Sequence, residues 1–353
     1  MRILVISLAG IGDTLFATPL IHELRANFPD ATIDALVMWA GSRDLLAHNP
    51  HLNTVHQKNL LTAGRLGTLK YLAALRRQGY DISLNTHPQS RIHYRIAARV
   101  IGAPLRLSHE YECFGLPDRL LVNRTVPQDY FRHAVDNNLA FLPLLGAKPL
   151  LPVHTPELYL TASDETWAVD FIARNQLAGH KILGLHVGSG GTKNLALRRW
   201  PLANYLELIR WLRRAQPNTR IIFFGGPEEQ ADHEHIRTTL GPDQLHFPAT
   251  TSLPQAAALL KYCDTFLSVD TALMHLAATM RVRRQIVIET PTWNTPIEPC
   301  GNPFTLVKNP AVGGRGLDFY RYDGGPIKGT PAELTACMAA VKVDDVFTAI
   351  TAG

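Results

Sequence analysis

The residue types best suited to binding an anion are concentrated in one segment, LGLHVGSGGTKNLALRRWP at residues 183–201. It begins with an apolar run that is typical of a buried parallel strand. Glycines then allow backbone N–H groups to approach a ligand closely, and a helix is predicted to begin near Pro201. The residues between these elements that suit such a site are Ser189, Gly190, Gly191, Thr192, Lys193, Arg198 and Arg199. They predict a phosphate or diphosphate site, and the alternative is an ordinary βα loop whose cations are only solvated.

A carboxylate follows the first predicted strand of the chain. Residues 2–8, RILVISL, have the pattern of a buried strand, and the glycine turn AGIGD that follows ends in Asp13. A carboxylate at the end of a strand is placed to take a proton from a substrate hydroxyl group. The alternative is that Asp13 caps the helix predicted over residues 14–28, and the two roles are compatible.

A third segment, VDTALMHLAA at 269–278, passes from the end of a predicted strand into a helix that starts at Asp270 or Thr271. Backbone amides at such a helix start point toward any bound anion. His275 lies one turn further into the helix, where the alternative is a hydrogen-bonded histidine of the core. The segment is therefore a second candidate for contact with phosphate.

These segments belong to a chain in which strands alternate with helices, a pattern that predicts parallel βαβ units. The plan of strand, glycine turn and helix occurs in both halves. We expect a domain over 1–150, a proline-rich linker, a second domain over 160–330, and helices at 331–353 that pack back on the first domain. The alternation of strand and helix signals is weak at 104–130. Ligands of such sheets bind outside the carboxyl ends of the strands.

Composition narrows the classes of protein. The 353 residues, 46% of them hydrophobic, are enough for two cores, and the formal charge of +5 suits an anionic ligand or a membrane surface without the basic stripe of a nucleic-acid-binding protein. The four cysteines are dispersed and predict neither a disulfide framework nor a zinc site, which favours reduced thiols in a cytoplasmic protein. The glycines and Asp13 interrupt the apolar N-terminus, so we expect neither a signal peptide nor a membrane span.

Four ordered motifs resemble glycosyltransferase family nine, the ADP-heptose:lipopolysaccharide heptosyltransferases. They are GDTLFATP at 12–19, GGTK and RRWP within 190–201, FGGPEE at 224–229 and VDTALMHLAA at 269–278. The resemblance implies an α/β protein of GT-B architecture, with two Rossmann-like, doubly wound parallel-sheet domains facing a central cleft. The first would bind the acceptor and the second the nucleotide sugar. The implied reaction is metal-independent transfer of heptose from ADP-heptose to a lipopolysaccharide inner-core hydroxyl, with inversion and no cofactor.

The resemblance also implies roles for individual residues. Asp13 matches the proposed general base, and the loop around Thr192 matches the binding site for the donor diphosphate. Arg198 or Arg199 stands where the family usually has a lysine. Asp270, Thr271 and His275 match the donor-contacting motif. Glu228 is a candidate contact to the ribose, and Thr251 and Ser252 are candidate neighbours of the adenine.

The motifs identify fewer residues for binding the acceptor than for binding the donor. Candidate acceptor contacts are Gly12, Thr14, His87 and Arg91, with His93, Arg95 and Arg132 as further basic residues. All of the basic ones are equally compatible with solvated helix faces. A glycolipid acceptor would bring the protein to the cytoplasmic face of the inner membrane as a peripheral contact, which the net positive charge permits.

Some residues depart from the family pattern. After HLAA, the segment TMRVRRQIVIETPTWNTP replaces the usual G-x-P turn and F-G-P-T strand end, so the sugar of the donor stays open. A relative that uses another nucleotide sugar, or a protein or small-molecule acceptor, is the main alternative. An NAD-type oxidoreductase is a weaker alternative, since A-G-I-G-D has an acid where a dinucleotide fingerprint needs glycine. A non-catalytic nucleotide-sugar-binding module is the last alternative.

Overall fold

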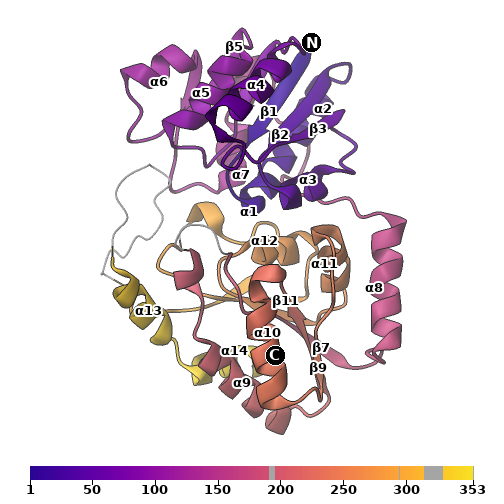
Figure 1. The fold of residues 1–353 in the computed structure, drawn as a ribbon. Coiled ribbons are helices and arrows are strands. Elements are labelled where there is room, and N and C mark those ends of the chain that lie inside the picture. Colours follow the sequence, from indigo (N-terminus) through magenta and orange to yellow (C-terminus); the bar gives the residue numbers. More distant parts are fainter. Residues whose placement is uncertain (191–194, 294, 314–328, 353) are drawn as a thin grey trace. The chain divides into compact units, whose positions relative to one another are not determined.

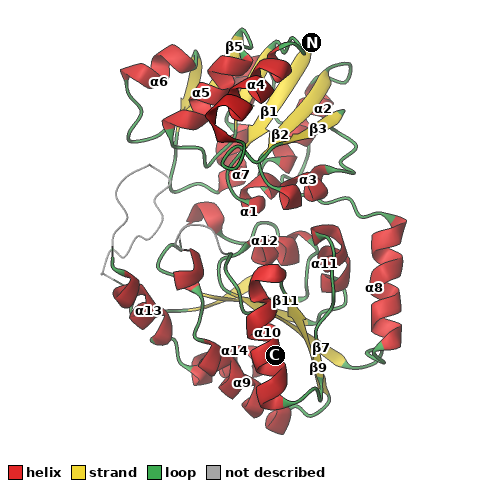
Figure 2. Cartoon of the chain, viewed as in Figure 1, coloured by secondary structure: helices red, strands yellow, loops and turns green. Residues whose placement is uncertain are grey.

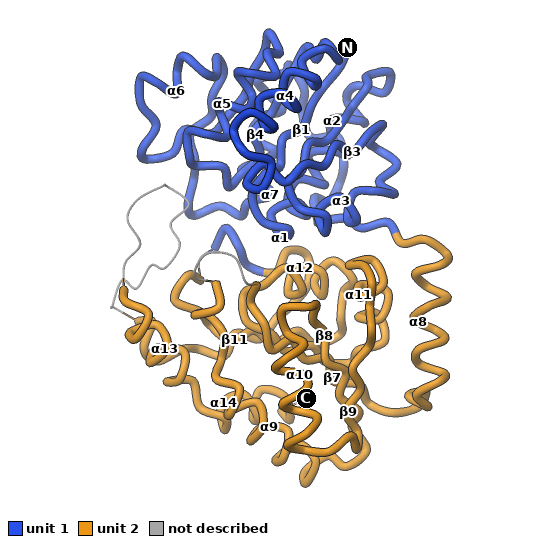
Figure 3. The backbone as a smooth tube through the Cα atoms, in the orientation of Figure 1, with its two compact units in different colours: residues 1–159, 294–298, 321–326 blue, residues 160–293, 299–320, 327–353 orange. Residues whose placement is uncertain are grey.

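The computed structural model describes residues 1–190, 195–293, 295–313 and 329–352, which form two compact units (Figure 3). Among the described residues, unit 1 comprises 1–159 and 295–298, and unit 2 comprises 160–293, 299–313 and 329–352. Figure 1 labels the elements along the chain, and Figure 2 shows that each unit has a sheet flanked by helices.

The sheet of unit 1 has six parallel strands in the order β3-β2-β1-β4-β5-β6. This is the strand order of the Rossmann fold, in which strands are added on one side of β1 up to β3 and on the other side from β4 onward. The boundary between β1 and β4 is called the reversal point below. The strands are β1 (Arg2–Ser7), β2 (Thr32–Val37), β3 (Thr54–Gln57), β4 (Ile82–Asn85), β5 (Leu105–Glu110) and β6 (Arg124–Pro127). β1 lies at the centre of the sheet, and its residues Ile3 to Ile6 are fully buried, as expected for an apolar strand covered on both faces.

Helices cover both faces of this sheet. They are α1 (Ile11–Leu15), α2 (Thr18–Asn27), α3 (Ala40–Leu46), α4 (Gly64–Arg76), α5 (Ile92–Ile101), α6 (Leu116–Leu121) and α7 (Ala134–Leu139), with 3-10 turns η1 (Leu142–Leu145) and η4 (Thr295–Ile297). The expected end of α5 is confirmed, because Gly102 has the left-handed φ of 77° that suits glycine after a helix.

Two expectations for unit 1 were wrong in detail. The single helix predicted over 14–28 is two helices, because the chain bends at Phe16 and Ala17 and α2 restarts with Pro19 in its first turn. The segment 104–130, where the strand and helix signals of the sequence are weak, contains β5, α6 and β6. β5 was missed because its buried positions include Ser108 and His109, which interrupt the apolar run of a central strand.

The sheet of unit 2 repeats the topology of unit 1. Its order is β12-β11-β10-β7-β8-β9, again all parallel, with β7 and β10 adjacent at the reversal point. The strands are β7 (Lys181–His186), β8 (Thr219–Phe224), β9 (Leu245–His246), β10 (Thr265–Ser268), β11 (Arg284–Ile288) and β12 (Phe304–Val307). β9 and β12 are the edge strands of this sheet, and both were missed because they are short and flanked by proline.

The helices of unit 2 are α8 (Ala162–Arg174), α9 (Leu202–Ala215), α10 (Gln230–Leu240), α11 (Leu253–Leu260), α12 (Ala272–Thr279), α13 (Pro331–Ala339) and α14 (Val343–Thr351), with η2 (Leu195–Arg198) and η3 (Pro227–Glu229). The cap of α8 is Thr161 with Asp164. None of the helices in the described part of the chain is both long and apolar enough to cross a membrane.

The last two helices belong to unit 2, which differs from the expectation that they pack on the N-terminal domain. Val341, Val346 and Ile350 lie in the same apolar cluster as Trp200 of unit 2. The indole N–H of Trp200 also donates to the carbonyl of Val341 at 2.9 Å. The apolar face of these helices is therefore buried within unit 2.

Candidate active site

In unit 1 the candidate residues lie at the reversal point of the sheet. β1 and β4 pair directly, with Ile6 opposite Asn85, and the loops that leave these two strands begin beside each other. The first loop leads into α1, whose third residue is Asp13, and His87 is on the second loop. This is the place at which open α/β sheets bind ligands.

Asp13 is partly exposed and holds the start of α1. It is the third residue of that helix, and its Oδ2 accepts a hydrogen bond from the backbone N–H of Gly10 at 2.6 Å. A Cβ at position 10 would lie 2.8 Å from the same oxygen, so glycine is required for this approach. The capping role is therefore real, although it serves α1 and not the long helix expected from the sequence. The second carboxylate oxygen does not take part in this bond.

Two neighbours of Asp13 were candidate acceptor contacts. Thr14 is fully buried and donates to Ser42 Oγ at 2.8 Å, so in this structure its hydroxyl joins α1 to α3. Gly12 is half-buried on the first turn of α1. Contact of either residue with an acceptor stays a prediction.

The loop after β4 is held by buried polar contacts. His87 is 1% exposed, its backbone N–H donates to Asn138 Oδ1 at 2.7 Å, and its Nδ1 lies 3.3 Å from the hydroxyl of Tyr111. Burial holds the pKa of His87 well below its usual value, so the ring is neutral. Tyr111 has a pKa raised by burial, and the charge of Asp13 adds to that rise, which places Asp13 within electrostatic reach of this cluster.

Arg95 explains the shape of the same loop. It is 2% exposed, forms an ion pair with Asp118 at 2.5 Å, and donates to the carbonyls of Gln89 and Ser90. It was a candidate acceptor cation, but in the structure its guanidinium is used to fix the backbone between β4 and α5. Arg91, the residue before α5, is exposed and stays a predicted acceptor contact.

His93 and Arg132 are the remaining basic candidates of unit 1. Both are exposed, and Arg132 Nε lies 4.0 Å from Asp129. A surface ion pair of this length contributes little stability and leaves the cation accessible.

In unit 2 the glycine loop follows β7 at the corresponding reversal point. Ser189 is buried and its hydroxyl donates to the carbonyl of Leu195 at 2.5 Å, which ties the two ends of the loop together. Gly190 has a φ of 81°, a conformation that favours glycine. Gly191, Thr192 and Lys193 lie outside the described residues, so their predicted contacts with phosphate stay predictions.

Arg198 connects this loop to the segment after β10. It is 8% exposed, it forms an ion pair with Asp270, and it donates to Thr292 Oγ1 at 3.0 Å. Burial raises the pKa of Asp270, and the guanidinium of Arg198 opposes that rise. His275, also buried, has its Nε2 3.9 Å from Asp270 Oδ1. The motifs assigned Arg198, Asp270 and His275 to one donor site, and the structure brings the three together. Arg198 and Asp270 form an ion pair there, and His275 lies beside it.

Arg199 faces two carboxylates where η3 is followed by α10. Its guanidinium lies 3.0 Å from Glu229 and 2.9 Å from Asp232. Glu229 is 5% exposed, and burial raises its pKa. A Cβ at Gly188 would collide with the carboxylate of Glu229, so the glycine loop and this side chain are packed directly together. Glu228, the predicted ribose contact, is exposed beside it.

Sequence reasoning missed Glu229. The signal was present in the pair of acids within FGGPEE, but the pattern alone does not show which of the two turns inward. A cavity of about 200 Å³ lies in unit 2 beside this network, and its lining includes Arg199, Asp232 and Trp200.

The start of α12 has the expected capping residue. Thr271 Oγ1 accepts from the N–H of Met274 at 3.3 Å and lies 3.1 Å from His186 Nδ1 at the end of β7. Burial lowers the pKa of His186 to about 3, so this link between the two strand ends is made by a neutral ring. The amides of the first turn of α12 therefore stand at a fixed place relative to the glycine loop.

Thr251 and Ser252 lie before α11. Ser252 caps that helix by accepting from Gln255 N–H at 3.3 Å, and Thr251 is exposed with its hydroxyl bound to Gln255 Oε1 at 3.1 Å. Their predicted position beside an adenine stays a prediction.

Residues 68–312 match the family model described as glycosyltransferase family 9 (heptosyltransferase), which is more than half of the chain. The chain belongs to glycosyltransferase family 9. It is similar to lipopolysaccharide heptosyltransferase 3 of Escherichia coli, with 24% identity over 76% of this chain and 78% of the relative. The expectation of a glycosyltransferase is confirmed, and an oxidoreductase and a non-catalytic module are thereby set aside.

Two solved structures confirm the GT-B fold. The structure of E. coli ADP-heptose lipopolysaccharide heptosyltransferase II has a TM-score of 0.71 at 20% identity, covering 100% of this chain and 98% of that one. E. coli heptosyltransferase WaaC with ADP-2-deoxy-2-fluoro heptose has a TM-score of 0.67 at 20% identity, covering 90% and 96%. This family 9 glycosyltransferase therefore has two Rossmann-like domains of GT-B type.

Proposed function

We propose that this glycosyltransferase moves a heptose from ADP-heptose to a hydroxyl group of a lipopolysaccharide inner-core acceptor, with inversion at the anomeric carbon. The main support is that the motif residues of both halves lie at the reversal points of their sheets: Asp13 after β1, and Ser189, Gly190, Asp270 and Thr271 after β7 and β10. The names of the relatives, which are heptosyltransferases of lipopolysaccharide, support the choice of sugar and acceptor.

Asp13 is proposed as the general base. Its carboxylate takes the proton of the acceptor hydroxyl while that oxygen forms the new bond to the anomeric carbon. The bond from this carbon to the diphosphate breaks on the opposite face, ADP leaves with the electron pair, and the configuration inverts. The bond from Gly10 N–H to Asp13 Oδ2 fixes the direction of the carboxylate that is proposed to take the proton.

The diphosphate is proposed to bind between the glycine loop of residues 188–193 and the first turn of α12. Backbone amides at the helix start stabilise the charge that develops on ADP. Because Arg198 is paired with Asp270, we assign it to holding these two segments together. Arg199 is likewise paired, with Glu229 and Asp232. We therefore propose that Lys193 and the backbone amides offset the charge of the leaving group, without a metal ion.

The acceptor is proposed to be a glycolipid that the enzyme meets at the cytoplasmic face of the inner membrane. Leu116 and Leu120 of α6 are 74% and 70% exposed, and Phe131 is 89% exposed. The cations Arg119 and Arg132 stand next to them in the sequence and are exposed too. Apolar side chains beside cations suit a peripheral contact with anionic lipid. Sedimentation with anionic vesicles should decrease in a Leu116→Ser, Leu120→Ser variant, and equal sedimentation would contradict this contact.

A transfer assay tests the proposal. Purified enzyme is mixed with ADP-heptose and truncated inner-core acceptors, and the product is followed by mass spectrometry. Parallel reactions contain UDP-glucose or GDP-mannose as the donor. We expect the acceptor to gain one heptose only with ADP-heptose. Transfer from another nucleotide sugar, or to a protein or small molecule alone, would instead support a family relative with other substrates.

A further inference from the structure

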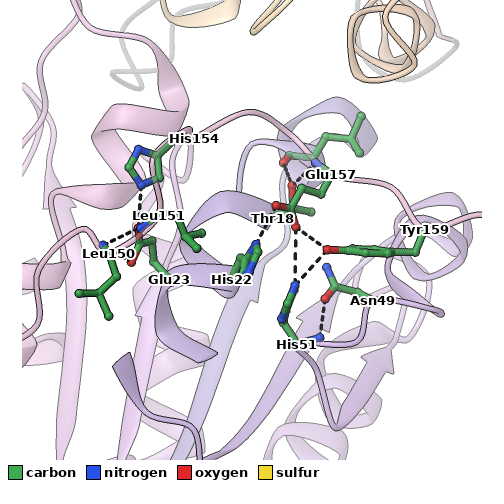
Figure 4. Close-up of polar contacts among 11 residues, drawn as sticks. Thr18, His22, Glu23, Asn49, His51, Leu150, Leu151, His154, Glu157 and Tyr159 are labelled. Carbon is green, nitrogen blue, oxygen red and sulfur yellow. Dashed lines mark hydrogen bonds and ion pairs between the residues drawn. The ribbon is translucent and has the colours of Figure 1, made fainter. Parts of the chain in front are cut away.

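A cluster of two histidines and one glutamate lies in unit 1, and none of the three is among the residues assigned to transfer. His22 is on α2, His51 is in the segment between α3 and β3, and Glu157 is in the proline-rich segment that ends unit 1 at Tyr159 (Figure 4). One ligand atom from each residue lies within 4.8 Å of the others. Residues from three distant parts of the sequence are thus gathered around one point.

We propose that His22, His51 and Glu157 bind a divalent transition-metal ion of the zinc class. Two imidazole nitrogens and one carboxylate oxygen are a ligand set that zinc prefers, whereas magnesium and calcium prefer oxygen alone. Three protein ligands leave a fourth position for water.

The distances between the ligand atoms fit such an ion. Metal bonds of about 2.1 Å in a tetrahedral site put neighbouring ligand atoms about 3.4 Å apart. His22 Nδ1 lies 2.8 Å from Glu157 Oε1, and His51 Nε2 lies 3.9 Å from Glu157 Oε2. The required value falls between these two distances. Their exposed fractions of 28%, 16% and 25% allow the ion to enter from solvent.

The surroundings hold the ligands in place. The hydroxyl of Tyr159 donates to Glu157 Oε2 at 2.8 Å, and the backbone N–H of Glu157 donates to Thr18 Oγ1 at 2.8 Å. The backbone N–H of His51 donates to Asn49 Oδ1 at 2.9 Å. Such contacts orient ligands and raise affinity in metal sites.

The two rings are stacked, with centroids 3.7 Å apart and an angle of 15° between them. A metal ion binds in the plane of an imidazole ring, so one ring must turn out of this stack when the ion binds. His51 Nε2 must also leave the hydroxyl of Tyr159, which lies 3.0 Å away. The ion would then replace the hydrogen bond between His22 Nδ1 and Glu157 Oε1.

The ion would attach the last segment of unit 1, which contains Glu157, to α2. The segment that contains Glu157 is already bound to α2 through Glu23, which is fully buried and accepts from the N–H groups of Leu150 and Leu151 at 2.8 to 2.9 Å. His154 adds a contact of 2.7 Å to the same carboxylate. A metal at His22 would be a second attachment on the same helix, and it would connect residues 135 positions apart.

The test uses the full-length enzyme, treated with a chelator and dialysed, in a Cys113→Ser background because Cys113 is an exposed thiol. Binding of Zn²⁺ is measured by competition with a chromophoric chelator, and Co²⁺ is added separately for its visible spectrum. We expect one ion per chain, an increase of the melting temperature with Zn²⁺, and a Co²⁺ spectrum of four- or five-coordinate type.

Single His51→Ala and Glu157→Gln variants should bind Zn²⁺ at least about tenfold more weakly and lose the thermal shift. His154→Gln is the matched control, since it alters a neighbouring histidine of the same segment, and it should bind as the parent does. Unaltered binding in the His51 and Glu157 variants, or absence of stoichiometric binding by the parent, would overturn the proposal and leave a hydrogen-bonded cluster only. If either variant fails to fold, the Co²⁺ spectrum of the parent decides, because an octahedral spectrum excludes this site.

Discussion

Replacing Asp13 by asparagine separates the two roles that the structure gives this carboxylate. The amide oxygen of the new side chain can still accept from Gly10 N–H, now 2.6 Å from Asp13 Oδ2, so α1 keeps its first turn. The amide cannot take a proton, and the loss of a general base lowers a rate by about 100- to 10,000-fold. We therefore expect the transfer rate of Asp13→Asn to fall by that factor. Its melting temperature should equal that of the parent, and so should its affinity for ADP, which unit 2 is proposed to bind.

Asp13→Ala removes the cap as well as the base. Loss of a capping bond costs about 1 kcal/mol, which for a unit of this size lowers the melting temperature by about 2 to 4 °C. For Asp13→Asn the matched control is Asp164→Asn. Asp164 also caps a helix from its third position and accepts from Thr161 N–H at 2.9 Å. It should change neither transfer nor stability appreciably.

Initial rates by mass spectrometry, melting curves and ADP titration calorimetry measure these three quantities. If Asp13→Asn transfers within tenfold of the parent rate, Asp13 is only a cap and the proposed mechanism is wrong. Equal loss of ADP affinity and of transfer would make its role structural.

Three further predictions concern stability. Arg198→Met leaves the buried carboxylate of Asp270 without its cation, and urea unfolding should show a loss of about 3 to 5 kcal/mol. Gly188→Ala forces Glu229 away from its place and should cost about 1 to 3 kcal/mol in the same measurement. His109 is fully buried, and burial lowers its pKa to about 4, so below about pH 6.5 the unfolded chain binds a proton that the folded one does not. Stability should fall as the pH decreases from about 6.5 to about 4, by roughly 3 kcal/mol from this group, and a His109→Asn variant should show a smaller pH dependence.

Each of these has a direct control. Adding Asp270→Asn to Arg198→Met removes the unpaired charge and should recover part of the lost stability; no recovery would mean that the cost arises elsewhere. Gly226→Ala is matched to Gly188→Ala, since a Cβ at Gly226 meets nothing within 4 Å, and an equal loss in both would contradict the proposed clash. Parallel pH profiles of the parent and His109→Asn would exclude His109 as a source of acid sensitivity.

The sequence predicted the repeated plan of the fold because that plan depends on local signals. Apolar runs of strand length, glycine turns and helix starts are read within about ten residues, and they placed β1, β7 and β10 with their loops correctly. β5 and the edge strands β9 and β12 were missed because their residues are mixed or few. Their strand geometry comes from pairing with neighbours that are distant in the sequence, which no local pattern contains.

The partners of the charged residues were also beyond local reading. Arg198 and Asp270 were both assigned to the donor because each lies in a motif, but their pairing spans 72 positions and follows from the adjacency of β7 and β10. Arg95 was assigned to the acceptor for its charge, and its burial beside Asp118 depends on how α5 and α6 pack. Residue type indicated which segments form the candidate site, whereas the tertiary structure determines the partner of each charged side chain.

The pairing of Arg198 with Asp270 has a consequence for the donor diphosphate. An unpaired carboxylate at position 270 would repel a phosphate group at the start of α12. The guanidinium of Arg198 cancels that charge, and the same nitrogen, Nη1, also donates to Thr292 Oγ1. A lysine there would offer a point charge and would fix Asp270 less firmly. In the proposed donor site, the net attraction for ADP would then come from groups without a carboxylate partner, chiefly the amides of the glycine loop and of α12. A donor site of this kind depends more on the backbone than on the count of cations in its motif, so Arg198→Lys should weaken ADP binding through misplacement of the α12 start rather than through loss of charge.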